Sequence, residues 1–259
     1  MAANTLIRSI YRLFDGMKVR VLVDSWYMRR TFIQSMQSRG FNVIGQVRID
    51  TRLYDEPPTR KPGQRGRPRK YGEKYTPKRI AHLKRSVTTL TLYGKEQRVR
   101  YRSKQVMARF LEGQRVRVVW CELEKDDATW KSPSLLLSTD LSLTPEQVIE
   151  SYGQRWSIES MFNQLKTAWG LKEAWQQTRQ TLHRWVHITM VGFGLIQLMS
   201  CLPETTLENI CHHSPWRKKH GVTAGRIRTG LSFEFRHVRV RDWWDRKCKK
   251  FRPPNKQTC

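Results

Sequence analysis

The sequence predicts a mixed α/β fold, and three features of its pattern support this. Residues Lys18–Val23 alternate and then run apolar, as a largely buried strand does, and Asp24 follows them directly. Trp26–Arg39 has helical character and precedes a second apolar strand at Phe41–Ile49, so strand, helix and strand follow one another. Further along, Thr144–Gln147 supplies an N-cap, a proline and an acidic residue, which together mark the start of an amphipathic helix.

Other segments complete the expected order of elements. Asn4–Phe14 has helical spacing and ends at Gly16. Val87–Tyr93 and Gln97–Tyr101 read as two strands of a hairpin joined at Gly94. The remaining expected elements are strands at Arg115–Glu122 and Ser134–Ser138, helical character over Trp169–Gln180, and an apolar helix at Leu182–Leu202.

The composition indicates a polyanionic partner. The chain has 259 residues with 49 Lys and Arg against 22 Asp and Glu, a formal net charge of +27. Nucleic acid fits this excess best, because the positive charge is not confined to amphipathic helices or to the flanks of an apolar span. The longest apolar run, Val186–Leu202, is short for a membrane span. Five scattered cysteines favour a reducing compartment, so we expect a cytoplasmic, nucleoid-associated protein with no membrane partner.

Four polar residues of the helix within Ser151–Lys166 share one face. Tyr152, Arg155, Glu159 and Lys166 fall within an arc of about 60° when each helical residue turns by about 100°. An ordinary solvated helix face is the alternative interpretation of this pattern.

The spacing Tyr-x2-Arg-x3-Glu-x6-Lys of these residues resembles the signature of a group of bacterial insertion-sequence transposases. These are DDE-type enzymes with a ribonuclease-H-like catalytic domain. The stretch Lys18–Tyr27 is similar to the family's strand that ends in the second catalytic Asp, here Asp24. Both blocks occur in the family's order, and the likeness covers most of Leu6–Cys201.

The resemblance implies a partial ribonuclease-H-like fold with a β-rich insertion between the second Asp and the helix that carries the Glu. The expected organisation is a catalytic part with Asp24 (1–50), a basic loop and β-rich insertion (51–140), the catalytic Glu helix and a backing helix (141–205), and a basic C-terminal tail (206–259).

The resemblance also implies a chemistry, that of a cut-and-paste DNA transposase which cleaves DNA and transfers strands with metal ions. Asp24 and Glu159 are the expected catalytic residues and metal ligands, at a two-metal site for Mg²⁺ or Mn²⁺. Arg155 and Lys166 are expected to hold phosphates, and Tyr152 to contact the backbone or to stack at the DNA end. The expected partners are double-stranded DNA, as transposon ends and target, and a second copy in a homodimer on DNA.

Alternatives remain open for several of these residues. Asp24 can instead cap the following helix, and Arg155 can form an ordinary ion pair with Glu159. Tyr27 is placed to hydrogen-bond near the same site. Asp140 follows the last strand and is a tempting third carboxylate, although the resemblance gives it no catalytic role.

The family's first Asp is not visible upstream of Asp24. Asp15 follows a helical pattern and reads as a helix-end residue. We therefore expect a C-terminal portion of a transposase or a truncated copy, with little activity of its own and an exposed sheet edge that favours self-association. The alternative is an inactive DNA-binding remnant that binds transposon ends. A ribosomal or RNA-binding protein fits the charge but does not explain the helix signature.

Thr51–Tyr75 is rich in Pro, Gly, Lys and Arg and is expected to be an exposed loop. Its Arg65-Gly66-Arg67-Pro68 segment resembles the core of an AT-hook, which lays arginines into A·T minor grooves. A basic loop that contacts phosphates without reading bases is the alternative. A loose cluster in the C-terminal part lacks the ligand spacing of a zinc site; its members are Cys201, Cys211, His212, His213 and His220.

Overall fold

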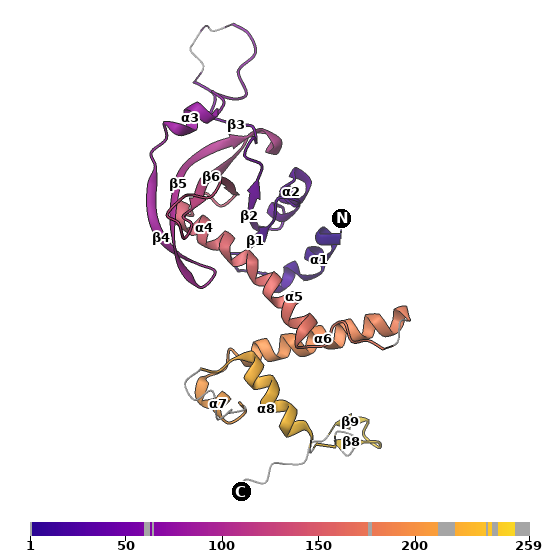
Figure 1. The fold of residues 1–259 in the computed structure, drawn as a ribbon. Coiled ribbons are helices and arrows are strands. Elements are labelled where there is room, and N and C mark those ends of the chain that lie inside the picture. The colour runs from indigo at the N-terminus through magenta and orange to yellow at the C-terminus, as the bar shows by residue number, and fades with distance from the viewer. Residues whose placement is uncertain are drawn as a thin grey trace. The chain divides into compact units, whose positions relative to one another are not determined.

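The chain forms two compact units, residues 1–158 and 159–259, each of which is described by itself. The structure is a computed structural model that describes residues 2–59, 63, 65–175, 178–211, 221–236, 238–239 and 243–251. Figure 1 shows a curved sheet in the first unit and a group of helices in the second.

The first unit contains seven strands and several helices. The strands are β1 (Arg20–Val23), β2 (Asn42–Val47), β3 (Leu53–Tyr54), β4 (Ser86–Leu92), β5 (Lys95–Ala108), β6 (Gln114–Leu123) and β7 (Ser134–Ser138). The α-helices are α1 (Ala2–Ile10), α2 (Arg30–Gln37), α3 (Pro77–Ala81) and α4 (Pro145–Gly153), and the 3₁₀ turns are η1 (Tyr11–Phe14), η2 (Arg109–Leu111) and η3 (Gln154–Trp156).

All seven strands join one mixed sheet in the order β1-β2-β7-β6-β5-β3, with β4 also paired to β5. β1 and β2 are parallel, and every other pair is antiparallel. Because β7 pairs directly with β2, the strands of the 51–140 stretch continue the same sheet that carries Asp24. The predicted α/β class is confirmed.

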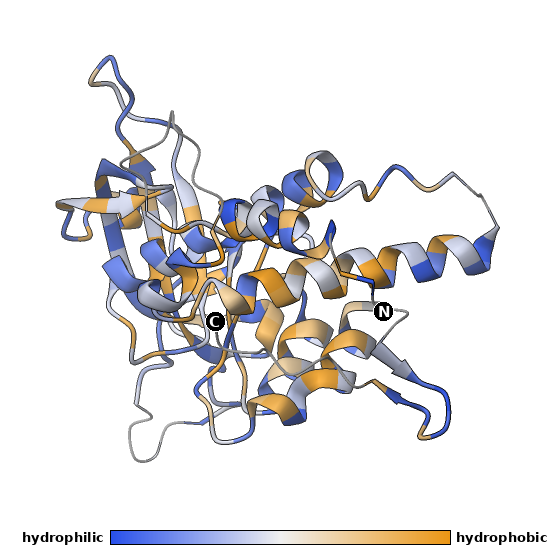
Figure 2. Cartoon of the chain, turned by 90° about the horizontal axis from the view of Figure 1, so that it is seen from below, coloured by the Kyte–Doolittle hydropathy of each residue, from blue (hydrophilic) through white to orange (hydrophobic). Residues whose placement is uncertain are grey.

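The two faces of the sheet pack against different helices. Val118, Trp120 and Leu137 belong to a core that includes residues of α2, whereas Val119 and Leu136 belong to a core that includes residues of α4. Burial on both faces explains why Val118–Cys121 of β6 and Leu135–Leu137 of β7 are continuous apolar runs rather than alternating ones. Figure 2 shows apolar residues concentrated along the helices and strands.

The predicted hairpin between β4 and β5 is confirmed. Its two-residue loop is Tyr93 and Gly94, with φ angles of 56° and 75°. Positive φ at both loop positions matches the twist of the flanking strands in a two-residue turn, and Gly94 adopts it without steric cost. β5 then runs on to Ala108, well past the end expected at Tyr101.

The stretch expected as one amphipathic helix is divided in the structure. Thr144 and Gln147 form a reciprocal capping box at the start of α4, as predicted. The 3₁₀ turn η3 then separates α4 from α5 (Ser157–Thr167). A 3₁₀ turn winds more tightly than an α-helix, so it changes the shared face that one continuous helix would give to Tyr152 and Glu159.

Two helix boundaries differ from the prediction. The helix expected from Trp26 begins only at Arg30, because hydrogen-bonded turns occupy the residues after Asp24. The helical character expected over Trp169–Gln180 is interrupted, since α5 ends at Thr167 and Gly170 has a φ of 65°. A left-handed glycine of this kind commonly terminates a helix.

The second unit contains the rest of α5 and the remaining elements. These are α6 (Arg179–Met199), α7 (Glu204–Glu208), α8 (Ala224–Arg236), and a short hairpin of β8 (Trp244–Asp245) and β9 (Lys250–Phe251). Ile196, Leu207, Cys211 and Ile227 form its buried core. Among the described residues, no helix combines the length and the apolar character needed to cross a bilayer.

Candidate active site

Asp24 lies at the carboxyl end of β1, directly after the buried Val23. Its side chain is exposed, and its Oδ1 accepts a hydrogen bond of 3.0 Å from the backbone N–H of Trp26. Arg29, not Asp24, occupies the N-cap position of α2, so the helix-cap alternative is wrong. The second carboxylate oxygen has no hydrogen-bond partner in the described parts of the chain, which leaves it accessible to a ligand.

The end of β1 depends on a glycine in the neighbouring strand. Val23 pairs with Gly45 of β2 in parallel register. A Cβ atom at Gly45 would lie 2.7 Å from Cγ of Met28 and 2.9 Å from the carbonyl oxygen of Val23. One of these neighbours is backbone, so it has little room to move, and only glycine allows the strands and Met28 to approach so closely.

We expect Gly45→Ala to destabilise the first unit by about 1–3 kcal/mol, because the added methyl group overpacks a closed contact. Urea unfolding of the whole chain measures this effect. Gly194→Ala in α6 is the matched control. A Cβ atom at this position meets nothing within 4 Å, and the substitution replaces a glycine inside a helix. Equal stability of the Gly45→Ala variant and the wild-type chain would contradict the packing argument.

Tyr152 lies near Asp24 within the first unit, and Arg155 lies beside Tyr152. The Tyr152 hydroxyl donates a 3.3 Å hydrogen bond to Oε1 of Gln46, the β2 residue that follows Gly45. Burial raises the pKa of the Tyr152 phenol, Arg155 beside it opposes the rise, and the negative charge of Asp24 adds to it. The Arg155 guanidinium lies 5.8 Å from the centre of the Tyr152 ring. The Tyr152 phenol is therefore near enough to Asp24 to be affected by its charge, and Arg155 lies beside the same phenol.

Glu159 and Lys166 both lie on α5, Glu159 in its first turn and Lys166 in its last. They belong to the second unit and are described with it. Both side chains are exposed. Tyr27 is 41% exposed, its ring packs on Phe32 with centroids 5.6 Å apart, and its backbone N–H donates to the Asp24 carbonyl.

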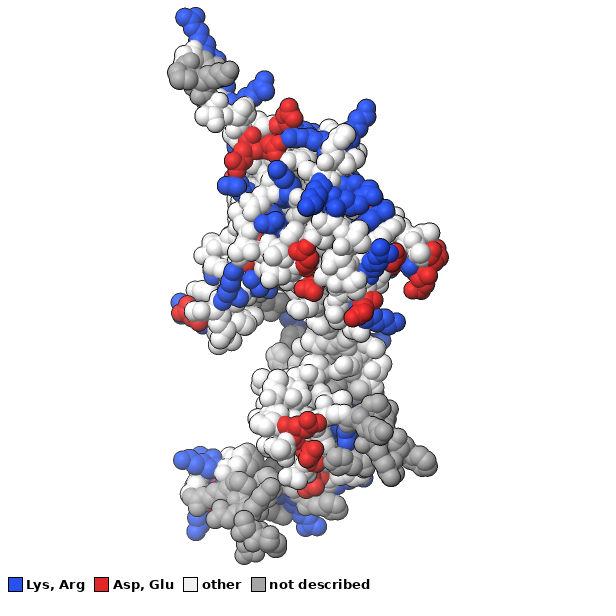
Figure 3. All heavy atoms as spheres, turned by 90° about the vertical axis from the view of Figure 1, so that its left-hand side faces the viewer, with Lys and Arg blue, Asp and Glu red and all other residues white. Residues whose placement is uncertain are grey.

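The basic loop carries exposed Arg65 and Arg67, and Figure 3 shows cationic side chains at its projecting end. The sequence predicts an exposed loop, and the structure adds that the base of this loop is anchored. Asp55 accepts a 2.6 Å hydrogen bond from the Tyr75 hydroxyl and forms an ion pair with Arg79. The anchored base fixes where the loop leaves the sheet.

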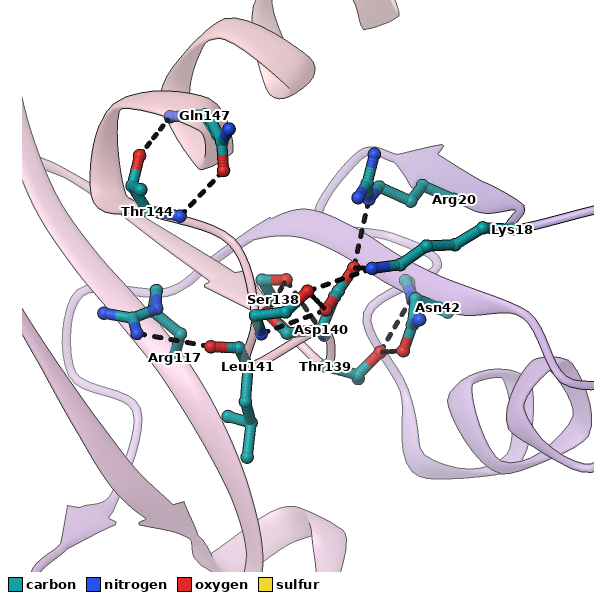
Figure 4. A network of polar contacts seen from close by, with 12 residues as sticks. Lys18, Arg20, Asn42, Arg117, Ser138, Thr139, Asp140, Leu141, Thr144 and Gln147 are labelled. Carbon is teal, nitrogen blue, oxygen red and sulfur yellow. Dashed lines mark hydrogen bonds and ion pairs between the residues drawn. The ribbon is translucent and has the colours of Figure 1, made fainter.

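Asp140 is held in a polar network at the other end of β1, as Figure 4 shows. Its carboxylate lies 3.4 Å from Nζ of Lys18 and 3.1 Å from Nε of Arg20, and it accepts a 2.6 Å hydrogen bond from the Ser142 hydroxyl. The side chain is only 6% exposed. These contacts occupy both of its oxygens, and β1 separates it from Asp24, so Asp140 ties β1 to the end of β7 instead of completing the site.

Asp140 should contribute a pH-dependent part of the stability. Burial alone would raise its pKa, but hydrogen bonds from Ser142 and the charges of Arg20 and Lys18 lower it from 3.8 to about 2. A lowered pKa in the folded state means that the stabilisation is present above pH ~4 and is lost as the pH falls towards 2. The shift corresponds to about 2 kcal/mol.

We therefore expect Asp140→Asn to lower the free energy of unfolding by about 2 kcal/mol at pH 7 and by much less at pH ~2.5. Urea unfolding at both pH values measures the difference. Asp126→Asn is the control, because Asp126 is exposed and forms no ion pair with the described residues. A loss of stability that is independent of pH would contradict the electrostatic explanation.

No group of three or more His, Cys, Asp or Glu side chains in the described residues is arranged to hold a metal ion. Of the Cys and His cluster, Cys211 is buried and Cys201 is exposed, while His212, His213 and His220 lie outside the described residues. The carboxylate oxygen available at Asp24 suits a hard divalent cation, but a metal pair needs further ligands.

Sequence reasoning missed two neighbours of Asp24. Gln46 is hydrogen-bonded to Tyr152, and its place one residue after Gly45, the strand partner of Val23, becomes apparent only from the register. Trp26 is 68% exposed and carries the guanidinium of Arg29 over its ring at 4.4 Å. A tryptophan two residues after a strand-end carboxylate was the available signal.

The fold and this strand-end carboxylate fit a nucleic-acid phosphoryl-transfer domain. The family model described as "Transposase DDE domain" matches residues 2–191. The chain therefore belongs to the DDE transposase family, and a transposase function, a DNA partner and dependence on a divalent metal follow from that membership. A comparison with curated proteins finds no match.

Proposed function

We propose that this chain carries two of the three catalytic carboxylates of a cut-and-paste transposase, Asp24 and Glu159, which bind Mg²⁺ or Mn²⁺. The observation that carries the proposal is the exposed Asp24 at the end of the parallel strand β1, with Tyr152 near it and Arg155 beside Tyr152. Glu159 follows Arg155 by four residues in the sequence, at the spacing on which the resemblance to the family rests.

Each residue has a distinct task in this proposal. Asp24 and Glu159 offer hard oxygen ligands, and the bound ions would activate the attacking oxygen and stabilise the leaving one. Arg155 and Lys166 hold phosphate oxygens, for which a guanidinium offers a bidentate fork. Tyr152, fixed by Gln46, contacts the sugar-phosphate backbone at the transposon end.

Three further positions complete the DNA contacts that we propose. Tyr27 contacts the DNA strand beside Asp24. Arg65 and Arg67 reach a DNA groove or DNA phosphates from the projecting loop. The enzyme acts as a homodimer on paired transposon ends and joins them to target DNA, within the bacterial nucleoid.

We also propose that the third carboxylate comes from a segment other than the residues ahead of Asp24 in this chain. Asp15 is the only acidic residue ahead of Asp24, and it ends the 3₁₀ turn η1 instead of a strand. β1 pairs only with β2 among the described strands, so its other edge can accept a strand that ends in Asp.

Cleavage of a plasmid that carries the element's terminal repeats tests this function in Mg²⁺ or Mn²⁺. The chain alone should give little or no 3′-end nicking, and the chain extended by the upstream-encoded segment should nick at the repeats. Robust nicking by the chain alone would overturn the proposed division of the carboxylates. No nicking by the extended chain would overturn the catalytic proposal.

A catalytically inactive protein that binds transposon ends is the second candidate. It is favoured by the absence of a three-ligand metal group from the described residues. This protein would protect the terminal repeats from nuclease digestion and inhibit a complete transposase in the same assay, with or without its upstream segment.

A further inference from the structure

A large pocket with several arginines opens beside Asp24 in the first unit. Its volume is about 710 Å³, within the range of about 300–1,000 Å³ that is usual for ligand sites. The wall runs from Ser25 and Arg29, past the segment that follows β2, to Arg109 and Phe110 at η2. Ser25 directly follows Asp24, so the pocket adjoins the strand-end carboxylate. We call it the arginine pocket.

Its rim has more positive than negative charge. Five arginines and one carboxylate line it; they are Arg29, Arg30, Arg48, Arg52, Arg109 and Asp50. Arg48 is paired with Asp50 at 2.9 Å, and Arg30 with Glu112 at 2.9 Å. The other three arginines have no acidic partner in the parts of the chain that the structure describes. An anion is therefore the natural complement of this rim.

The floor of the same pocket is apolar. Met28 and Val47 are each 7% exposed, and Phe110 is half-buried against the core beneath. Simple phosphate binding does not require such a floor. A cationic rim over an apolar and aromatic floor matches a nucleotide, whose flat base is apolar on its faces and whose phosphate is anionic.

We propose that the arginine pocket holds a single unstacked nucleotide of a DNA strand, next to the phosphate that reaches Asp24. Its base lies over Met28 and Phe110, and its phosphates contact Arg52 and Arg109. A paired base within a duplex cannot enter, because stacking and pairing keep it inside the helix. This inference deepens the proposed function and rests on it, since it takes Asp24 to be the residue that meets the scissile phosphate.

Fluorescence anisotropy without divalent metal tests the pocket separately from catalysis. The full chain is titrated with a blunt duplex and with the same duplex carrying a short single-stranded overhang. We expect the overhang to improve affinity about tenfold or more, because stacking of an unpaired base on apolar and aromatic side chains strengthens binding. The double variant Arg52→Ala/Arg109→Ala should lose this preference while still binding the blunt duplex.

Lys84→Ala/Arg85→Ala is the matched control, because it removes two exposed positive charges that lie outside the pocket. This control variant should lower the affinity for both duplexes by the same factor and keep the preference for the overhang. Phe110→Ala should also lose the preference, and its unfolding midpoint checks that the fold is intact. The arginine double variant changes only exposed side chains, so it keeps the test valid if Phe110→Ala does not fold.

Equal affinity of the wild-type chain for both duplexes would overturn the inference, as would a preference that survives in the arginine double variant. Competition by a free deoxynucleoside monophosphate at micromolar concentration would assign the pocket to free nucleotides instead of a DNA strand. The overhang preference without nicking by the extended chain would refute the catalytic proposal alone. Nicking without the preference would refute the pocket alone.

Discussion

Glu159→Gln and Asp24→Asn are each expected to lower metal-dependent nicking by about a hundredfold or more in the extended chain described above. Loss of a residue that only supports a metal ligand typically costs ten- to a hundredfold, so loss of a ligand itself should cost at least as much. Plasmid nicking in Mg²⁺, with band intensities followed over time, measures the rate. DNA affinity should stay the same or increase slightly, because each change removes a negative charge.

Two exposed acidic residues provide controls for these variants. Glu234→Gln on α8 and Asp126→Asn in the β6–β7 connection make the same chemical changes elsewhere. Both should nick at the wild-type rate. If Asp24→Asn nicks as fast as these controls, Asp24 is not a metal ligand and the strand-end site has another role.

DNA affinity should fall by about a thousandfold or more between ~50 and ~200 mM salt. The net charge of +27 gives the chain ample capacity for several phosphate contacts, each of which releases a counterion. Electrophoretic mobility shift or anisotropy titrations at a series of salt concentrations measure the slope. A nearly flat dependence would show that the positive charge of this chain serves another purpose.

The basic loop can be examined in the same titrations. Arg65→Ala/Arg67→Ala should reduce the slope by about two if both residues contact phosphates, with equal losses on A·T-rich and G·C-rich duplexes. A loss confined to A·T-rich DNA would instead assign the segment to the minor groove.

Local sequence patterns correctly predicted elements that depend on residues close together in the sequence. Ser134–Ser138 was predicted with both ends correct, and the capping residues Thr144 and Gln147 behave as expected. The errors arose where a tertiary or backbone effect overrides periodicity. Turns that include a hydrogen bond to the Asp24 carboxylate delay the start of α2, and the left-handed Gly170 breaks a stretch that otherwise has helical composition.

The candidate site was predictable in part for the same reason. Asp24 was found because a carboxylate after an apolar strand is a local signal. The hydrogen bond between Tyr152 and Gln46 joins residues that are far apart in the sequence, and no periodicity relates them. The arginine pocket was missed because its members come from three separate segments, of which each alone resembles an ordinary basic surface.

The direct pairing of β2 with β7 has a consequence for how the chain folds. The whole run from β3 to β6 lies between these two neighbours in the sequence. Hairpins β4–β5 and β5–β6 close short loops and can form early, whereas β2 and β7 meet only after a long loop has closed. We therefore expect the hairpins to assemble first and the β1–β2 pair to join them late through β2, which makes the pairing of β2 with β7 the slow step of folding.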